Sequence, residues 1–297
     1  MTYEEFQGNV IDTLEKRFPK NTSLNIQRIL KTNDRELDGL VISDPSSRVS
    51  PTIYLDPLFD AFQSGSSSFD EIIDIIFETY SQHRNAKPFD TREFTDFERA
   101  HDNIVFRLVN RKRNKRLLSD VPFMPYLDLA LTFYFLTELE GEGLGAILIH
   151  NNHMEEWGKK KEDLYEAARG NMKRLLPATI TPMDEILKSM GLPDQYEAAE
   201  YERVPLFVLS NERKNYGAAT ILYEGQLKKA AEVIGKEKLC IIPSSVHEVL
   251  IMPYEKAKRG GDIDEMVREV NYTTLSPDEV LSDHAYYYDA STDTIVE

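Results

Sequence analysis

The sequence predicts an α+β fold of mixed helices with short antiparallel sheets, arranged as two packed halves. Short apolar runs typical of β-strands lie at 206–209, 239–242 and 249–252. Between the first two runs, apolar residues recur at helical spacing. These residues are Leu227, Ala230, Ala231 and Ile234. Helix and strand therefore alternate within one short stretch, as expected of a mixed fold.

Length and composition are those of a globular protein with a full core. The chain has 297 residues, of which 41% are hydrophobic and 29% charged. A chain of this length forms one large domain or two of about 150 residues. We place the boundary in the acidic stretch 194–203, which predicts an N-terminal half at 1–195 and a C-terminal half at 196–297.

The first elements follow from local patterns. An amphipathic helix ends before Pro19, because proline disfavours a helical conformation in the residue that precedes it. The apolar positions of this helix are Phe6, Val10, Leu14 and Phe18. Segments 24–31 and 37–43 then predict an antiparallel hairpin, and 51–55 predicts a third strand.

Two capping patterns predict the next helices. Ser68 and Glu71 have the spacing of a capping box, in which side chain and backbone groups of both residues bond reciprocally. They precede a helix with a wide apolar stripe, which favours a core position. Thr95 and Glu98 predict a second, shorter helix. Segment 104–109 is either a strand or a helix end.

A second hairpin is predicted from 127–137 and 144–151, which are separated by a glycine-containing turn. Asn151 or Asn152 is placed to cap the helix that follows, and Gly158 to end it. The remaining predicted elements are helices at 162–176, at 262–270 and from Ser276 onwards, and a strand at 285–288. In that last strand, Tyr286 and Tyr288 lie on one face and Tyr287 on the other.

Eight separated segments occur in one order along the chain. They are KTNDRELDGLVI (31–42), SPTIYLDPLFDAF (50–62), RLVNRKRNKRLLSDVP (107–122), WGKKKEDLYEAARGN (157–171), VLSNE (208–212), YGAATILYEG (216–225), IIPSSVHEVLIMP (241–253) and LSPDEVLSDHAYYYD (275–289). Together they resemble an uncharacterised bacterial family catalogued as domain of unknown function 5688. The resemblance spans nearly the whole chain and supplies no catalytic residue, substrate or cofactor.

We expect a cytoplasmic protein with no membrane association. The first 18 residues are acidic and amphipathic, unlike a signal peptide, and no apolar stretch approaches the roughly 20 residues that span a bilayer. The one cysteine, Cys240, lies in an apolar run. Burial there raises a thiol pKa, so we expect an unreactive thiol and no disulfide.

A basic strip at 107–116 contrasts with the acidic chain, whose formal net charge is −16. The strip, RLVNRKRNKR, holds Arg107, Arg111 and Arg113 among its six basic residues and contains no acid. It predicts a solvated turn and short helix, with contact to a protein partner or a second copy as the alternative. Nucleic acid is disfavoured, because no aromatic residue separates the charges and an acidic protein repels polyanions.

His150 and His153 are three residues apart, with acidic residues nearby. One helical turn could present both imidazoles to a divalent metal. Hydrolytic zinc helices more often space two histidines four apart. We therefore interpret the pair as a polar helix cap and assign no metal or cofactor.

Ser245 and His247 lie between two β-like runs, where a hydroxyl and an imidazole could meet. Nucleophilic catalysis would also need an oriented base and an oxyanion hole. No nucleophile-elbow motif is present to make one. The pattern favours a tight turn with hydrogen-bonding side chains, and we assign no catalytic residue.

A polar loop lies between apolar elements at Asn211, Glu212 and Arg213, just before Tyr216. Loops on rigid scaffolds often carry binding residues. The leading hypothesis is a non-enzymatic protein-binding or adaptor module that contacts a protein partner or itself. Its binding residues are Asn211, Glu212, Arg213, Arg107, Arg111, Arg113 and His247. The alternatives are a hydrolase using a metal at His150 and His153 or a Ser245/His247 pair, and a nucleic-acid-associated factor using the strip 107–116.

Overall fold

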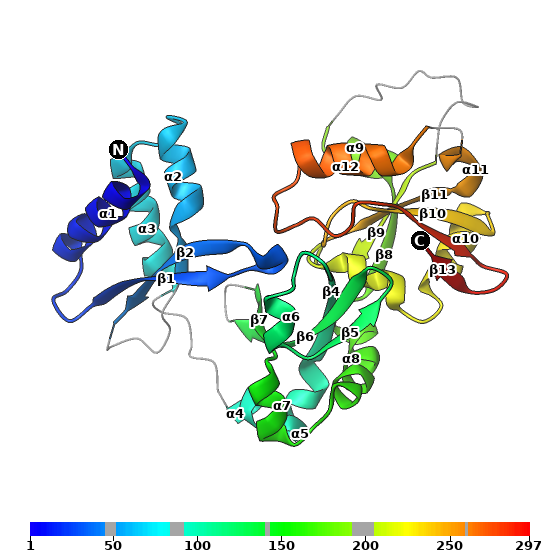
Figure 1. Cartoon of the computed structure of the whole chain (residues 1–297), viewed down its shortest axis with the longest axis horizontal. Coiled ribbons are helices and arrows are strands. Elements are labelled where there is room, and N and C mark those ends of the chain that lie inside the picture. Colours follow the sequence, from blue (N-terminus) through cyan, green and yellow to red (C-terminus); the bar gives the residue numbers. More distant parts are fainter. Residues whose placement is uncertain (45–51, 84–91, 140–142, 192–204, 259–260) are drawn as a thin grey trace. The chain divides into compact units, whose positions relative to one another are not determined.

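The computed structural model describes residues 1–44, 52–83, 92–139, 143–191, 205–258 and 261–297, which form two compact units (Figure 1). Unit 1 comprises Met1–Lys31, Arg35–Thr91 and Thr137–Gly145, and unit 2 comprises Thr32–Asp34, Arg92–Leu136 and Ala146–Glu297. The predicted α+β fold with short antiparallel sheets is confirmed. The predicted boundary between 195 and 196 lies outside the described residues.

In its described residues, unit 1 combines three helices with a three-stranded antiparallel sheet of order β1-β2-β3. Its elements are α1 (Tyr3–Arg17), β1 (Ser23–Leu30), β2 (Glu36–Ser43), β3 (Thr52–Tyr54), α2 (Leu55–Gln63) and α3 (Phe69–His83). The predicted capping box starts α3: the Ser68 N–H donates to Glu71 Oε2 at 2.7 Å, and the Glu71 N–H donates to Ser68 Oγ at 3.3 Å. The first helix, the hairpin and the third strand are confirmed.

Aromatic side chains fill the core of unit 1. Phe6 is fully buried, and its ring centroid lies 5.2–6.1 Å from those of Phe59, Phe62 and Phe69. Such spacings are favourable for aromatic pairs. The apolar stripes of α1 and α3 therefore meet in one cluster, which explains their helical periodicity.

The first sheet of unit 2 has the order β4-β6-β5, with β7 pairing β6. The surrounding elements are α4 (Arg92–Thr95), α5 (Phe97–Ala100), η2 (His101–Asn103), β4 (Ile104–Asn110), α6 (Leu117–Asp120), β5 (Phe123–Tyr126), β6 (Leu129–Leu139), β7 (Gly143–Leu148), α7 (Asn151–Trp157) and α8 (Lys161–Leu175). Segment 104–109 is thus a strand, and the second predicted hairpin is confirmed. Strand β5 has no counterpart in the sequence predictions.

Two predicted caps in this region are wrong. Asp96, not Thr95, caps α5, because its Oδ1 accepts the Glu98 N–H at 3.0 Å. His150, not Asn151 or Asn152, occupies the cap position of α7. Gly158 ends α7 in the left-handed conformation with φ of 62°, as predicted.

The second sheet of unit 2 has six antiparallel strands in the order β13-β12-β10-β11-β9-β8. The elements are β8 (Ala178–Pro182), α9 (Met183–Ser189), β9 (Phe207–Asn211), η3 (Gly217–Leu222), α10 (Gln226–Ile234), β10 (Lys238–Pro243), β11 (Val249–Pro253), α11 (Tyr254–Ala257), α12 (Ile263–Thr273), β12 (Tyr286–Asp289) and β13 (Thr294–Val296). The helix predicted from Ser276 is wrong, because that segment forms a turn.

Strand β10 is buried on both faces. Leu239 and Ile241 join the large core that includes α10, whereas Cys240 and Ile242 join a second cluster with Val267 of α12. Figure 1 shows α12 lying along the six-stranded sheet. Tyr286 and Tyr288 of β12 are buried and Tyr287 is partly exposed, so the predicted alternation is confirmed. Within the described ranges, no helix combines the length and apolarity needed to cross a bilayer.

Several loops emerge at the same end of the six-stranded sheet, where β9 and β10 stop and β11 and β12 start. Val249 at the start of β11 pairs with Leu209 near the end of β9 and with Pro243 at the end of β10. On the other side of β10, Ile241 pairs with Tyr286 at the start of β12. The segments that follow β9 and β10 and precede β11 and β12 therefore emerge together.

A buried asparagine organises the turn after β4. Asn114 is fully buried in the basic strip, and its Nδ2 donates to Asn33 Oδ1 and to the Asn110 carbonyl, each at 2.7 Å. Its Oδ1 accepts the Asn33 N–H at 2.6 Å. Asn33 lies in η1 (Thr32–Asp34), which belongs to unit 2.

We expect Asn114→Ala to lower the free energy of unfolding by about 2–3 kcal/mol, because it leaves several buried polar groups unpaired. Urea unfolding followed by circular dichroism measures the change. Lys115→Ala, on the exposed next residue, should stay within about 0.5 kcal/mol of the parent. Equal stability of the two variants would contradict the assignment.

Candidate functional site

The loop that follows β9 is shaped by Asn211, which is 1% exposed. Its Oδ1 accepts the Arg213 N–H at 3.0 Å and the Asn215 N–H at 3.4 Å, while its Nδ2 donates to the Asn215 carbonyl at 2.9 Å. Asparagine favours such turns because its side chain replaces a backbone partner. The loop then reaches Tyr216, whose φ of 51° is left-handed.

The Arg107 guanidinium makes cation–π contacts with the rings of both Tyr216 and Tyr134. Arg107 Cζ lies 3.7 Å from the ring centroid of Tyr216 and 3.9 Å from that of Tyr134. Arg107 on β4 is opposite Thr132 on β6, and Val105 is opposite Tyr134, so these side chains share one face of the sheet. We call Arg107, Tyr134 and Tyr216 the arginine clamp.

Burial raises the pKa of Tyr134, with the Arg107 guanidinium opposing that effect. The phenol therefore stays protonated at neutral pH and can donate a hydrogen bond. Cation–π contacts of this kind contribute about 0.5–2 kcal/mol each, more where the cation is partly desolvated. Arg107 is half-buried, so the clamp holds its guanidinium in one orientation.

His247 contacts Tyr216, and so holds one residue of the clamp in place. Its Nδ1 accepts the Tyr216 N–H at 3.1 Å, and the two ring centroids are 5.1 Å apart. A neutral imidazole that accepts at Nδ1 carries its proton on Nε2. That Nε2 lies 3.6 Å from Glu279 Oε1. The imidazole thus links the loop after β9 to the segment before β12.

The loop residues Glu212 and Arg213 are exposed, and Arg111 lies in the exposed turn after β4. Arg113 is paired elsewhere: its Nη2 lies 2.9 Å from both carboxylate oxygens of Asp283. Of the seven predicted binding residues, the structure therefore brings together Arg107, Asn211 and His247.

The basic strip begins in β4, which ends at Asn110, and continues as a turn at 111–116 that α6 follows. The predicted turn and short helix are therefore present, but residues 107–110 form a strand. Not every residue of the strip faces solvent without a contact. Asn114 is buried, and Arg113 forms an ion pair with Asp283. The sequence reasoning missed Tyr134, Tyr216 and Glu279 as site residues. Tyr134 lies in an apolar strand, and the only feature that distinguishes it in the sequence is a hydroxyl group among apolar neighbours.

His150 and His153 make local contacts. His153 Nδ1 accepts the His150 N–H at 3.0 Å, which satisfies a backbone donor at the start of α7. Burial lowers the pKa of His153, and His150 adds to this effect, so the ring is neutral at neutral pH. His150 Nδ1 lies 2.7 Å from Asp120 Oδ2. This arrangement is the polar cap favoured by the sequence.

The Ser245 side chain contacts the backbone of His247 and not its imidazole. The Ser245 hydroxyl accepts the His247 N–H at 3.0 Å, and the His247 Nδ1 is occupied by Tyr216. The segment is a tight turn with hydrogen-bonding side chains, as predicted from the sequence.

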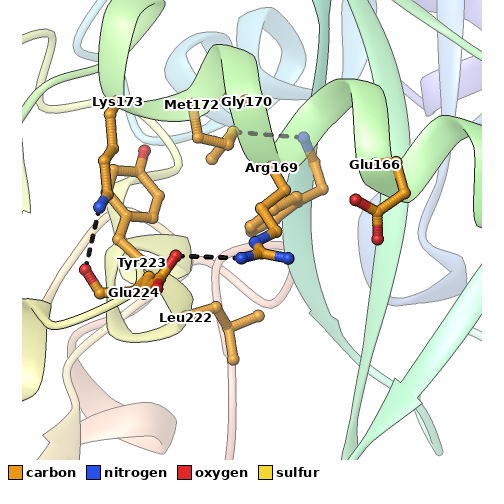
Figure 2. Close-up of a pocket in the computed structure, with 9 residues that line it drawn as sticks. Glu166, Arg169, Gly170, Met172, Lys173, Leu222, Tyr223 and Glu224 are labelled. Atoms are coloured by element: carbon orange, nitrogen blue, oxygen red, sulfur yellow. Dashed lines mark hydrogen bonds and ion pairs between the residues drawn. The ribbon is translucent and has the colours of Figure 1, made fainter.

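A surface hollow of about 420 Å³ lies between α8 and the end of η3. Figure 2 shows Arg169 and Lys173 on α8 facing Glu224. Arg169 Nη2 is 3.0 Å from Glu224 Oε2, and Lys173 Nζ donates to the Glu224 carbonyl at 3.0 Å. The hydrogen bond from Arg169 lowers the pKa of Glu224. The two cations and this acid satisfy one another, so the hollow is a weaker candidate than the clamp.

The fold and the site define an α+β protein in which Arg107 and Tyr134, on one face of the four-stranded sheet, meet Tyr216 from the loop after β9. A family model matches residues 3–290, and the chain belongs to this family, which is described as a family of unknown function (DUF5688). The resemblance seen in the sequence is confirmed. No curated protein and no solved structure matches the chain with significance.

Gly217 allows the loop to approach the sheet closely. A Cβ at this position would lie 2.2 Å from Ser210 Oγ, 2.6 Å from the Asn211 nitrogen and 2.7 Å from the His247 carbonyl oxygen. Two of these atoms belong to the backbone and cannot rotate away.

We therefore expect Gly217→Ala to destabilise unit 2 by about 3 kcal/mol and to displace Tyr216. Thermal unfolding and tyrosine fluorescence measure the two effects. The matched control is Gly170→Ala on α8, where a Cβ meets nothing within 4 Å. That variant should gain about 0.5–1 kcal/mol, because alanine favours a helix over glycine. A neutral Gly217→Ala would contradict the close approach.

Cys240 is fully buried in β10, and burial raises the pKa of its thiol to about 12. The thiolate is the reactive form, so we expect a disulfide reagent at pH 8 to leave the folded protein unlabelled. In urea the same reagent should label one thiol, matching the single cysteine. Rapid labelling of the folded chain would show that β10 is accessible.

Proposed function

We propose that this chain is a non-enzymatic binding module for another protein, and that the arginine clamp takes a carboxylate of that partner. The observation that carries the proposal is the state of Arg107. Its Cζ lies 3.7 Å from the ring centroid of Tyr216 and 3.9 Å from that of Tyr134. Among the described residues, no carboxylate forms an ion pair with it.

The N–H donors of a guanidinium lie in its plane. A guanidinium that stacks on an aromatic ring keeps these in-plane donors for hydrogen bonds. A planar fork of this kind matches a carboxylate with two parallel bonds. Because Tyr134 and Tyr216 already hold the group in place, a ligand loses less side-chain entropy on binding.

The charge distribution supports a single carboxylate over a nucleic acid. A phosphate backbone is bound by many cations at once, whereas the clamp presents one guanidinium on a chain of net charge −16. The Arg113 side chain of the strip is engaged by Asp283. Arginine and tyrosine are, in contrast, the residues most enriched at the energetic centres of protein interfaces.

The surroundings of the clamp support binding more than catalysis. The Ser245 hydroxyl and the His247 Nδ1 both accept backbone N–H groups. A hydroxyl nucleophile needs a base within hydrogen-bond reach that can accept its proton. Here both groups shape the loops that place Tyr216.

We expect Arg107→Lys to weaken binding of the protein partner about 30-fold, or about 2 kcal/mol. Lysine keeps the charge but lacks the planar fork. Partners are identified by crosslinking in cell extract and then measured as purified proteins. N-acetylglutamate amide, a minimal carboxylate probe, should shift the Arg107 Nε–H resonance in NMR spectra, and N-acetylglutamine amide should not.

The control is Arg213→Lys, because Arg213 is exposed on the neighbouring loop, and it should bind like the parent. A partner that binds the Arg107 variant equally well would refute the role of the clamp. Recovery of the chain alone, together with turnover of a test substrate, would refute the binding module itself.

A further inference from the structure

Three residues far apart in the sequence meet in unit 2. Asp128 lies in the turn between β5 and β6, His284 precedes β12, and Glu297 follows β13. One carboxylate oxygen of each acid and one ring nitrogen of the histidine all lie within 4.8 Å of one another. None of the three belongs to the arginine clamp.

We propose that Asp128, His284 and Glu297 bind one divalent transition-metal ion. The strand register explains why they converge. Tyr287 on β12 pairs with Val296 on β13, which places Glu297 opposite Tyr286. The Tyr286 hydroxyl donates to Asp128 Oδ1 at 2.6 Å. The end of β13 and the turn before β6 therefore face the same point.

The hydrogen bonds around His284 leave a lone pair directed at this point. An ionised carboxylate only accepts, so the Ser282 hydroxyl donates to Asp128 Oδ2 at 2.9 Å. The same hydroxyl lies 3.3 Å from His284 Nδ1. Having donated its proton to Asp128, it accepts from the Nδ1–H. The neutral imidazole then carries its lone pair on Nε2.

That Nε2 atom is buried and has no hydrogen-bond partner. It lies 3.8 Å from Asp128 Oδ1, which is too long for a hydrogen bond. A lone pair that faces a carboxylate oxygen is repelled unless a cation lies between them. Either a metal ion or a proton on Nε2 supplies that positive charge. Metal titration and NMR of the imidazole distinguish the two.

The contacts behind these residues are those of a metal site. Metal-bound histidines usually donate their other ring N–H to an oxygen, which sets the tautomer and the ring orientation. Here Ser282, which is fully buried, takes that position and also bonds Asp128. Tyr286 is fully buried too, and its hydroxyl donates to Asp128.

The donor set indicates the class of ion. One imidazole and two carboxylates suit zinc or manganese, whereas an all-oxygen set would suit calcium or magnesium. Zinc binds nitrogen and oxygen ligands at about 2.0–2.2 Å, so the ligands must close around the ion. The exposed Glu297 side chain can make that movement.

The test uses the full chain, stripped with EDTA and titrated with zinc chloride and with manganese chloride by calorimetry. We expect one equivalent of one of these metals to bind. His284→Gln should abolish this binding, and Glu297→Gln should weaken it at least tenfold while leaving the fold intact. Ser282→Ala keeps all three ligands and should weaken binding about 10–100-fold.

The matched control is His153→Ala, which removes a histidine from the α7 cap and should bind metal like the parent. Circular dichroism verifies that every variant is folded. The proposal is overturned if neither metal binds stoichiometrically, if binding survives His284→Gln, or if it is lost in His153→Ala. It is also overturned if NMR shows a proton on His284 Nε2 at neutral pH that added metal does not displace.

Discussion

Burial of β10 on both faces is the constraint on which unit 2 depends. Leu239 and Ile241 point into one cluster and Cys240 and Ile242 into another, so the strand cannot shift by one residue without exchanging the two sets. Its register with β11 and β12 is thereby set. The loops at one end of the sheet inherit that register, and they contribute Tyr216 to the arginine clamp and His284 to the cluster at Asp128.

Asparagine side chains connect these rigid strands to their loops. Asn110 at the end of β4 accepts the N–H groups of Lys112 and Arg113 and donates to the Leu281 carbonyl. Asn211 performs the same local role at the end of β9. In both cases one buried amide replaces the backbone partners that the sheet no longer supplies. A loop held in this way can present a side chain without additional packing.

Local signals explain what the sequence could predict. The capping box at Ser68, the stop at Gly158 and the tyrosine alternation in β12 each depend on neighbouring residues, and each is confirmed. The short strands β5, β8 and β13 were missed, because their identity comes from the partner strand. The turn at Ser276 has the residues of a helix start, but no helix follows. Tyr134 and Tyr216 are distant in sequence, and only the folded sheet brings both to Arg107.

The two outermost strands of the six-stranded sheet affect how the protein can associate. Strand β13 has three residues, and β8 ends in Pro182, which has no N–H to offer a neighbouring chain. Short or proline-containing borders resist the addition of a foreign strand, and with it the growth of fibrils. Contacts through backbone pairing are therefore disfavoured along both outer strands, and the side chains of the loops offer the surface on which charge and shape can differ.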